Sequence, residues 1–152
     1  MRVIVQRVLK SNVEVNGKIV GSINNGLMLL VGFTYGDNEK TIDYMVDKVI
    51  NLRIFDDENG VMNKSLIDTH GSILSISQFT LYGDARKGRR PSYINALRGE
   101  EATLLYDLFN KKLRDNNINV EVGIFGADMK VSLINDGPVT ILLEKGDNDE
   151  KK

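Results

Sequence analysis

Cysteine and tryptophan are absent from the sequence, and histidine occurs once in 152 residues. Without cysteine the chain can form no disulfide, no thiolate nucleophile and no cysteine-ligated zinc site. Any Ser-His-Asp triad or histidine-rich metal site would depend on His70 alone, which lies in the turn-like segment Thr69-His70-Gly71. No paired-carboxylate pattern stands out either. We therefore expect no metal and no cofactor, and an exposed or locally hydrogen-bonded His70 rather than a catalytic one.

Long apolar runs are also absent, and the formal net charge is only −1. No segment is apolar for long enough to span a membrane as a helix. The N-terminal MRVIVQRVLKSNVEV carries Arg2, Arg7 and Lys10 where a signal peptide would be uninterruptedly apolar. These features favour a cytoplasmic protein without membrane contact. Because the chain is not basic overall, contact with a nucleic acid needs a local basic patch.

The composition is that of a globular protein, with 41% hydrophobic and 27% charged residues. A chain of this length buries enough surface to fold without a disulfide or a metal. We expect one domain at residues 1–145, followed by a flexible polar tail, GDNDEKK, at residues 146–152.

The first third of the chain is rich in strand signals. Apolar and polar residues alternate from Val3 to Val15, and Asn16-Gly17 is a strong signal for a hairpin turn, because both positions accept positive φ. A returning strand is predicted at Lys18–Ile23. The continuous apolar run Leu27–Phe33 is typical of a strand that is buried on both faces.

A helix is predicted after Asp37, a residue type that caps helix N-termini. Its apolar residues recur at the spacing that lines one helical face: Ile42, Met45, Val46, Val49 and Ile50. After it, NLRIF (Asn51–Phe55) favours a short strand and DDENG (Asp56–Gly60) a polar turn.

The middle of the chain predicts a further strand and a second helix. The run Ser72–Leu81 alternates in a way that leaves both faces apolar enough to be buried. The helix is expected at Glu100–Arg114 and ends at Asn116-Asn117. One stripe of this helix is apolar and consists of Ala102, Leu105, Phe109 and Leu113.

Three strand-like runs complete the chain, at residues 118–125, 129–134 and 139–144. They are divided by Gly126 and by the turn residues Asn135–Pro138. The resulting order, β-β-β-α-β-β-α-β-β-β, indicates a single α+β domain. In this domain two helices pack against a mixed or mostly antiparallel sheet.

One segment gathers positive charge. Between Ala85 and Arg98 there is no acidic residue, and the cations are Arg86, Lys87, Arg89, Arg90 and Arg98. Gly83 and Gly88 favour a flexible loop beside the polar end of the preceding strand. Taken alone, the run fits a solvated surface loop as well as a phosphate-binding loop.

Two motifs are more specific, namely SQFTL at Ser77–Leu81 and NDGPVT at Asn135–Thr140. Alone, the first fits a strand end whose side chains bond to nearby backbone, and Gly137-Pro138 fits an ordinary turn. Together, and in this order, the two motifs resemble those of the D-aminoacyl-tRNA deacylase family. The resemblance extends over Met1–Glu144 and includes the MRVIVQRV opening, the basic loop and FGADM at Phe125–Met129.

The resemblance implies a homodimer with a barrel-like sheet and active sites at the subunit interface. The pocket for the 3′-terminal aminoacyl-adenosine of tRNA would be lined on its catalytic side by Ser77, Gln78, Phe79 and Thr80. Gly137-Pro138 would be a Gly-cis-Pro element that projects from one subunit into the active site of the other. The remaining implied contacts are Phe125, Gly126 and Met129 with the adenosine, Arg7 with the Gly-Pro element, and Arg86, Lys87, Arg89 and Arg90 with the tRNA.

The implied activity is hydrolysis of the ester that joins a D-amino acid to tRNA, together with clearing of glycine mischarged on tRNA. Since no side chain is an obvious base, we expect the neighbouring ribose hydroxyl of the substrate to assist. A backbone N–H near Phe79 and Thr80 is the expected oxyanion stabiliser. A threonine without an adjacent base is poorly activated, which favours a binding or water-orienting role for Thr80 over a nucleophilic one.

Two alternatives stay open. The same fold resembles an editing domain fused to some threonyl-tRNA synthetases, which removes an L-amino acid, and the chain could also be an inert RNA-binding dimer. We expect tRNA rather than DNA as the partner in each case.

Overall fold

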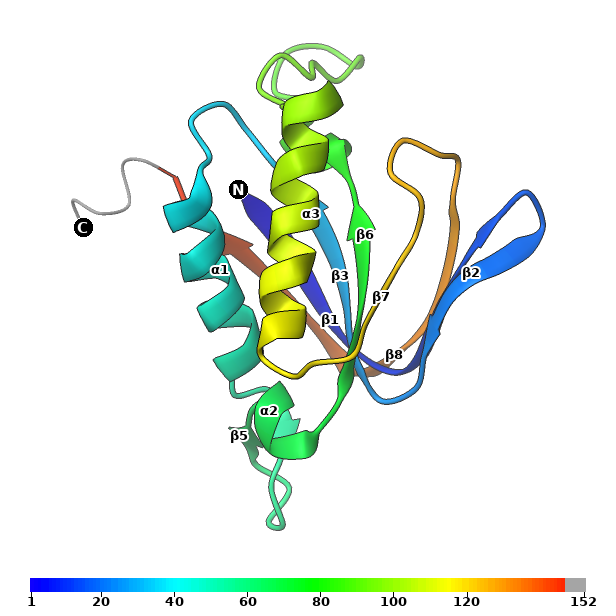
Figure 1. The fold of residues 1–152 in the computed structure, drawn as a ribbon, viewed down its shortest axis with the longest axis vertical. Helices are drawn as coiled ribbons and strands as arrows, with labels where there is room; N and C mark the ends of the chain where they lie inside the picture. The colour runs from blue at the N-terminus through cyan, green and yellow to red at the C-terminus, as the bar shows by residue number, and fades with distance from the viewer. Residues whose placement is uncertain (147–152) are drawn as a thin grey trace.

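The computed structural model describes residues 1–146, and the predicted tail lies outside this range except for Gly146. The described residues form a mixed sheet covered on one face by two long helices (Figure 1). The strand β1 (Arg2–Val15) has partners along both edges. On one edge it pairs first with β3 (Gly26–Gly32) and then with β2 (Lys18–Ile23), and on the other with β8 (Lys130–Glu144), in each case antiparallel.

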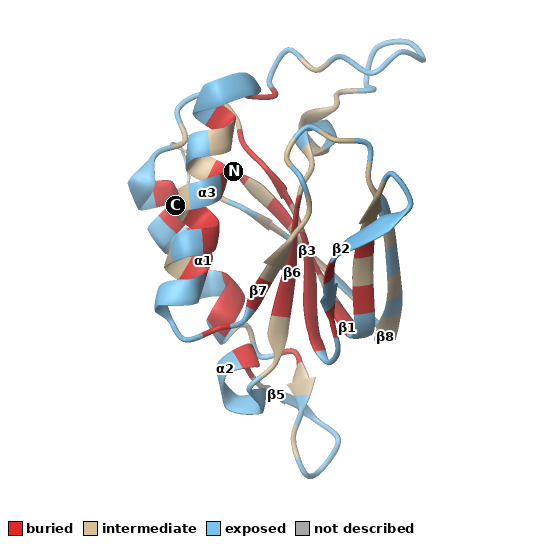
Figure 2. Cartoon of the chain, turned by 45° about the vertical axis from the view of Figure 1, so that its right-hand side comes forward, coloured by how far each residue is buried: buried red, intermediate tan, exposed pale blue. Residues whose placement is uncertain are grey.

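Two parallel strands extend the sheet beyond β3. These are β6 (Ser72–Ser77) and, next to it, β7 (Val120–Val122). Of the run predicted at residues 118–125, only β7 is a strand. The sheet curls into a nearly closed, barrel-like shape (Figure 2), and the prediction of an α+β domain with a mixed sheet is confirmed.

The helices α1 (Glu39–Asn51) and α3 (Gly99–Asp115) enclose the main core against the sheet (Figure 2). All five residues of the predicted stripe of the first helix are buried in α1. On α3 the predicted stripe is buried except for Leu105, which is half-buried, and Tyr106 and Asn110 are buried beside it.

The strands β3 and β6 are buried on both faces. Leu27 and Leu29 of β3 belong to the core under the helices, whereas Met28 belongs to a second cluster on the other face of the sheet. Leu74 and Ile76 of β6 join Met28 there. Burial on both faces is why these strands are continuous apolar runs in the sequence.

The N-terminus of α1 differs from the prediction. Asn38 is the N-cap, and its side chain accepts a hydrogen bond from the Thr41 amide while Thr41 Oγ1 accepts one from the Asn38 amide. Asp37 instead accepts hydrogen bonds from the Met1 amino group at 2.9 Å and from the Thr34 amide at 2.8 Å. Burial lowers the pKa of the Met1 amino group, and the Asp37 carboxylate opposes that shift. Asp37 therefore fixes the start of the chain rather than the helix.

The strand predicted at Asn51–Phe55 is misplaced. Asn51 still belongs to α1, and β4 (Phe55–Asp56) pairs with β5 (Met62–Lys64) in a separate two-stranded sheet. A short helix, α2 (Leu66–Thr69), follows and is not predicted, because a single turn is too short to show helical periodicity.

The strand predicted at Ser72–Leu81 ends early, at Ser77. The Gln78 amide donates the last sheet bond, to the Val31 carbonyl at 2.7 Å, and Phe79–Tyr82 then form a short 3-10 helix, η1. The polar motif therefore lies where the chain leaves the sheet and turns.

The last two predicted strands are one continuous strand, β8. Residues 136–139 bulge out of it, since Val8 pairs with Asn135 and Gln6 pairs with Thr140. The predicted turn is thus a protrusion on an unbroken strand.

The core assignment of α3 can be tested at Phe109, which is fully buried. Phe109→Ala should lower the free energy of unfolding by about 3–5 kcal/mol, because it removes buried contacts and leaves a cavity. Leu104→Ala, on the exposed side of the same helix, is the matched control and should cost less than about 1 kcal/mol. Urea unfolding at one fixed protein concentration measures both, and equal losses would contradict the assignment.

Candidate active site

A cavity of about 350 Å³ opens where the parallel strands β3 and β6 end. Val31 of β3 pairs with Ser77 of β6, and both residues line the cavity. The start of α3 and the loop after β7 complete its walls at the same end of the molecule (Figure 1). The cavity brings together Ser77, Gln78, Phe79, Phe125, Gly126 and Met129 of the predicted site.

Of the four predicted catalytic residues, Thr80 alone does not line the cavity, and it is exposed. Its hydroxyl accepts a hydrogen bond from Gln78 Nε2. An amide donor cannot take a proton from a hydroxyl, so this contact does not activate Thr80 as a nucleophile.

The main-chain N–H groups of Phe79 and Thr80 donate no hydrogen bond within the part of the chain that the structure describes. Phe79 and Thr80 are the first two residues of η1, and the first N–H groups of a helical turn have no hydrogen-bond partner inside that turn. Two free donors therefore follow directly on Ser77 and Gln78. Such a pair can stabilise negative charge that develops on an oxygen.

Phe79, Tyr93 and Arg98 form a stacked group at the edge of the cavity. The rings of Phe79 and Tyr93 meet edge to face with centroids 5.3 Å apart. The guanidinium carbon of Arg98 lies 4.2 Å from the centre of the Phe79 ring, and both residues line the cavity. The sequence places Arg98 in the basic run and does not connect it with the pocket. Arg98 directly precedes α3, and the start of α3 closes the cavity. Its place before the predicted helix is the sequence signal that could have identified Arg98 as a cavity residue.

Phe125 and Met129 supply apolar wall to the cavity. Phe125 packs against Tyr106 with ring centroids 5.8 Å apart, and the Tyr106 hydroxyl donates to the Ser75 carbonyl at 2.7 Å. Burial raises the pKa of Tyr106 further above its ordinary value. Gly126 has a φ of +80°, a conformation that side chains rarely adopt. The wall is therefore fixed from the core.

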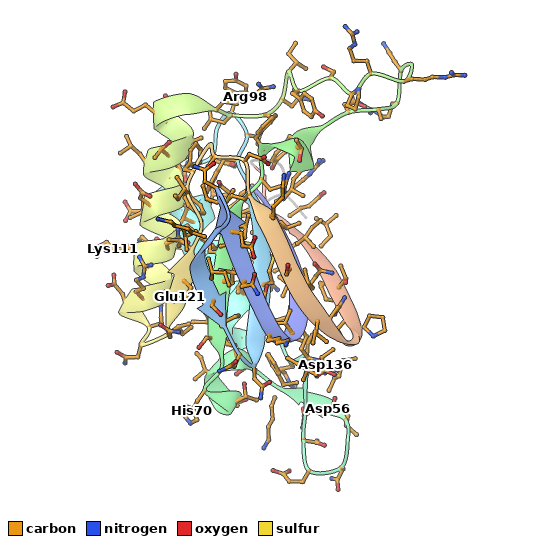
Figure 3. All side chains as sticks on the ribbon, turned by 90° about the vertical axis from the view of Figure 1, so that its right-hand side faces the viewer. Asp56, His70, Arg98, Lys111, Glu121 and Asp136 are labelled. Atoms are coloured by element: carbon orange, nitrogen blue, oxygen red, sulfur yellow. The ribbon has the colours of Figure 1, made fainter. Side chains whose placement is uncertain are left out.

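Gly137 and Pro138 lie away from this cavity. They are exposed in the bulge of β8 and are joined by a cis peptide bond. In Figure 3 the neighbouring Asp136 is labelled near one end of the sheet, and Arg98 at the other end, and the cavity lining does not include the bulge. A chain's own Gly-Pro element does not reach its own cavity.

Arg7 holds the bulge from within, and only 8% of this residue is exposed. Its Nε donates to the Asp136 carbonyl at 3.0 Å and its Nη1 to the Ile54 carbonyl at 2.8 Å. The carboxylates of Asp56 and Asp136 lie 3.4 and 3.6 Å from the guanidinium. A buried arginine with several such partners is a rigid anchor, so the position of Gly137-Pro138 is fixed relative to β1.

The basic loop extends from the cavity end of the molecule (Figure 3). Its four cations are exposed: Arg86, Lys87, Arg89 and Arg90. Arg86 is already paired, because its Nε and Nη2 donate to the Asp84 carboxylate at 2.9 and 2.7 Å. These hydrogen bonds lower the pKa of Asp84 to about 2. Within residues 1–146 the other three cations make no ion pair.

His70 is exposed and ends α2 in the left-handed conformation, with φ 56°, so the prediction of a turn position is confirmed. Figure 3 shows it at the opposite end from Arg98. Among the described residues, no three histidine, aspartate or glutamate side chains come close enough together to hold a metal ion. None of the helices in that range is both long and apolar enough to cross a membrane.

Comparison with known sequences identifies one family. Residues 4–144 match the sequence model of a protein family that is described as D-Tyr-tRNA(Tyr) deacylase. A D-aminoacyl-tRNA deacylase of Clostridium tetani is 60% identical over 144 residues, which cover 95% of this chain and 97% of that protein. One of Brevibacillus brevis is 58% identical over 144 residues, covering 95% and 99%.

Solved structures share the fold. The structure of a c-Myc DNA unwinding element binding protein has a TM-score of 0.91 at 39% identity and covers 96% of this chain and 99% of its own. The structure of a probable eukaryotic D-amino acid tRNA deacylase has a TM-score of 0.79 at 21% identity and covers 93% of this chain and 97% of its own. At this identity it supports the fold alone. The family model covers nearly all of the described residues, and the resemblance carried by the two motifs is confirmed. This chain belongs to the D-Tyr-tRNA(Tyr) deacylase family.

Proposed function

We propose that this protein hydrolyses the ester bond between a tRNA and a D-amino acid. Membership of the family identifies it as a hydrolase of aminoacyl-tRNA esters, and its relatives are named for D-aminoacyl substrates. The observation that carries the proposal is that residues 77–79 of SQFTL and Phe125, Gly126, Ala127 and Met129 of FGADM, which are distant in the sequence, line one cavity. Its volume of about 350 Å³ is in the range of small-ligand sites.

The proposed ligand is the 3′-terminal adenosine with its aminoacyl ester. The adenosine packs against Phe125 and Met129, which offer an aromatic face and a polarisable sulfur. The ester carbonyl lies at the free N–H groups of Phe79 and Thr80. Ser77 and Gln78 are close enough to these donors to hold the ribose or the amino acid by hydrogen bonds.

Catalysis depends on the substrate's own hydroxyl. Water attacks the ester carbonyl, and the two N–H groups stabilise the charge that develops on its oxygen. The neighbouring ribose hydroxyl orients the water in place of a protein base. The ester C–O bond then breaks, the ribose oxygen leaves with a proton, and the water oxygen stays with the amino acid.

This mechanism predicts that a substrate change matters more than loss of the only histidine. Replacing the ribose 2′-hydroxyl by hydrogen in a 3′-aminoacyl tRNA should slow deacylation by at least about 10²-fold, the lower range for lost acid–base assistance. His70→Ala should leave the rate nearly unchanged, because His70 lies far from the cavity. Single-turnover release of labelled amino acid measures both. A large His70→Ala defect in a folded variant, or indifference to the missing hydroxyl, would contradict the mechanism.

We also propose a homodimer in which Gly137-Pro138 of one subunit enters the cavity of the other. The bulge cannot reach the cavity of its own chain, is exposed, and is anchored by Arg7. Apolar side chains lie exposed along the same two strands, namely Leu9 on β1 and Ile134 and Leu142 on β8. They offer an apolar surface to a symmetric partner.

Such an element explains selection by handedness. A fixed main-chain obstacle beside the α-carbon excludes L side chains by their position, whatever their chemistry. The missing Cβ of Gly137 lets the main chain approach the substrate closely. Glycine on tRNA has no side chain to exclude, so it passes the same filter.

The expected specificity is cleavage of D-tyrosyl-tRNA and of glycyl-tRNA, with negligible cleavage of L-tyrosyl-tRNA. Activity should follow the dimer fraction on dilution, which light scattering at the assay concentrations determines. Comparable cleavage of the D and L substrates would reject the filter. An active monomer would reject the shared site.

The basic loop is proposed to contact tRNA phosphates. Changing Arg86, Lys87, Arg89 and Arg90 to alanine should weaken tRNA binding. The slope of the logarithm of the binding constant against the logarithm of the salt concentration should become shallower by about one unit for each lost phosphate contact. Because Arg86 is paired with Asp84, a variant that keeps Arg86 should show most of this effect. Titrations of tRNA at several salt concentrations measure the slope, and an unchanged slope would exclude the loop as a contact.

The same assays separate the alternatives. An L-specific editing enzyme would show the reverse preference between D- and L-tyrosyl-tRNA, and an inert RNA-binding dimer would bind charged tRNA without releasing the amino acid. One solved relative is named for binding a DNA element. For this chain we propose tRNA as the partner and expect duplex DNA not to compete with it. A cytoplasmic location and independence of cofactors stay predictions.

A further inference from the structure

Arg98 is the one charged residue that lines the cavity in the described part of the chain. The other lining residues are apolar or are glycine, serine or glutamine. The mechanism proposed above does not use this charge, since the N–H groups of Phe79 and Thr80 serve the ester. A cation beside an otherwise neutral cavity indicates an anionic part of the ligand.

The contacts of Arg98 leave its charge available. Its guanidinium lies 4.2 Å from the centre of the Phe79 ring and 5.5 Å from that of Tyr93. Within residues 1–146 it makes no ion pair, and its side chain does not cap α3. The aromatic rings therefore hold the guanidinium in place by one face, while the N–H groups at its edge stay free for an anion.

The proposed ligand offers one kind of anion. The ester, the ribose and the adenine are uncharged, and the α-amino group is cationic when protonated, so a guanidinium repels it. The phosphate that joins the terminal adenosine to the preceding nucleotide is the anion nearest to the cavity. Arg98 also ends the basic run that begins at Arg86, and the loop that carries this run extends from the same end of the molecule as the cavity (Figure 3).

We propose that Arg98 binds this terminal phosphate and thereby positions the end of the tRNA in the cavity. The inference rests on the function proposed above. Arg98 is a positioning residue, because the phosphate takes no part in the reaction. The planar guanidinium suits the task, since it stacks on Phe79 and can give parallel hydrogen bonds to a phosphate.

The test uses two unreactive probes, 3′-(D-tyrosylamino)-3′-deoxyadenosine with and without a 5′-phosphate. Calorimetry on the wild-type protein should show that the phosphate tightens binding roughly 10- to 100-fold, the range of hydrogen bonds to charged groups. Arg98→Met keeps an unbranched side chain against Phe79 and should abolish this gain without changing the Kd of the phosphate-free probe. Arg98→Lys should keep part of the gain.

Lys111→Met is the control, because it removes one positive charge, paired with Asp115, from the exposed surface of α3 at a place away from Arg98 (Figure 3). This variant should still bind the probe with the 5′-phosphate more tightly than the probe without it, by the same factor as the wild-type protein. With D-tyrosyl-tRNA, Arg98→Met should raise KM and leave kcat nearly unchanged, a split that a merely destabilised variant would not produce. Should Arg98→Met fail to fold, Arg98→Lys and Arg98→Gln provide the same comparison.

The outcomes distinguish the inference from the function on which it rests. A wild-type protein that does not release D-tyrosine from tRNA overturns the proposed function. A wild-type protein that releases D-tyrosine from tRNA but binds the two probes with equal affinity overturns the inference alone. Equal weakening of both probes by Arg98→Met also overturns it and assigns Arg98 to the adenosine or to packing.

Discussion

The parallel pairing of β3 with β6 is the constraint on which the candidate site depends. Both strands are buried on both faces, and a slip of one residue in either strand would exchange the side chains that it packs into the two apolar clusters. The resulting register places Val31 beside Ser77, and the hydrogen bond from the Gln78 amide to the Val31 carbonyl ends the sheet there. The free N–H groups of Phe79 and Thr80 come next along the chain. Core packing thus sets the position of donors that themselves lie at the surface.

The strand β1 connects that end of the molecule with the other. It pairs with β3 on one edge and with β8 on the other, and it carries Arg7, whose buried guanidinium holds the bulge at residues 136–139. The strand that forms one wall of the cavity and the strand that carries Gly137-Pro138 are therefore parts of one hydrogen-bonded sheet. If two chains share their sites, the accuracy with which a bulge meets the partner's cavity depends on this sheet and not on mobile side chains.

Sequence patterns predict the elements whose burial is regular, and they fail where distant contacts decide. The stripe of α1 is predicted because that helix packs by one face. Asp37 is misassigned as a cap because its partner is the amino group of Met1, 36 positions away in the chain. A bulge such as that at Gly137-Pro138 uses the residue types of a turn, so local sequence cannot tell the two apart. The link between Arg98 and the cavity depends on where α3 begins in space, and periodicity gives no information on that.

A cavity with aromatic walls, a single charge and free main-chain N–H groups at its edge has little chemistry of its own. What it can supply is position, which is enough when the substrate brings a reactive ester and a neighbouring hydroxyl. Position must then be fixed from both sides of the ester. The bulge of a second chain would confine the amino acid, and a phosphate held by Arg98 would confine the nucleoside. Because the phosphate takes no part in the reaction, its contact with Arg98 is equally strong before and during the ester cleavage, so Arg98 raises the occupancy of the cavity rather than the rate of the chemical step.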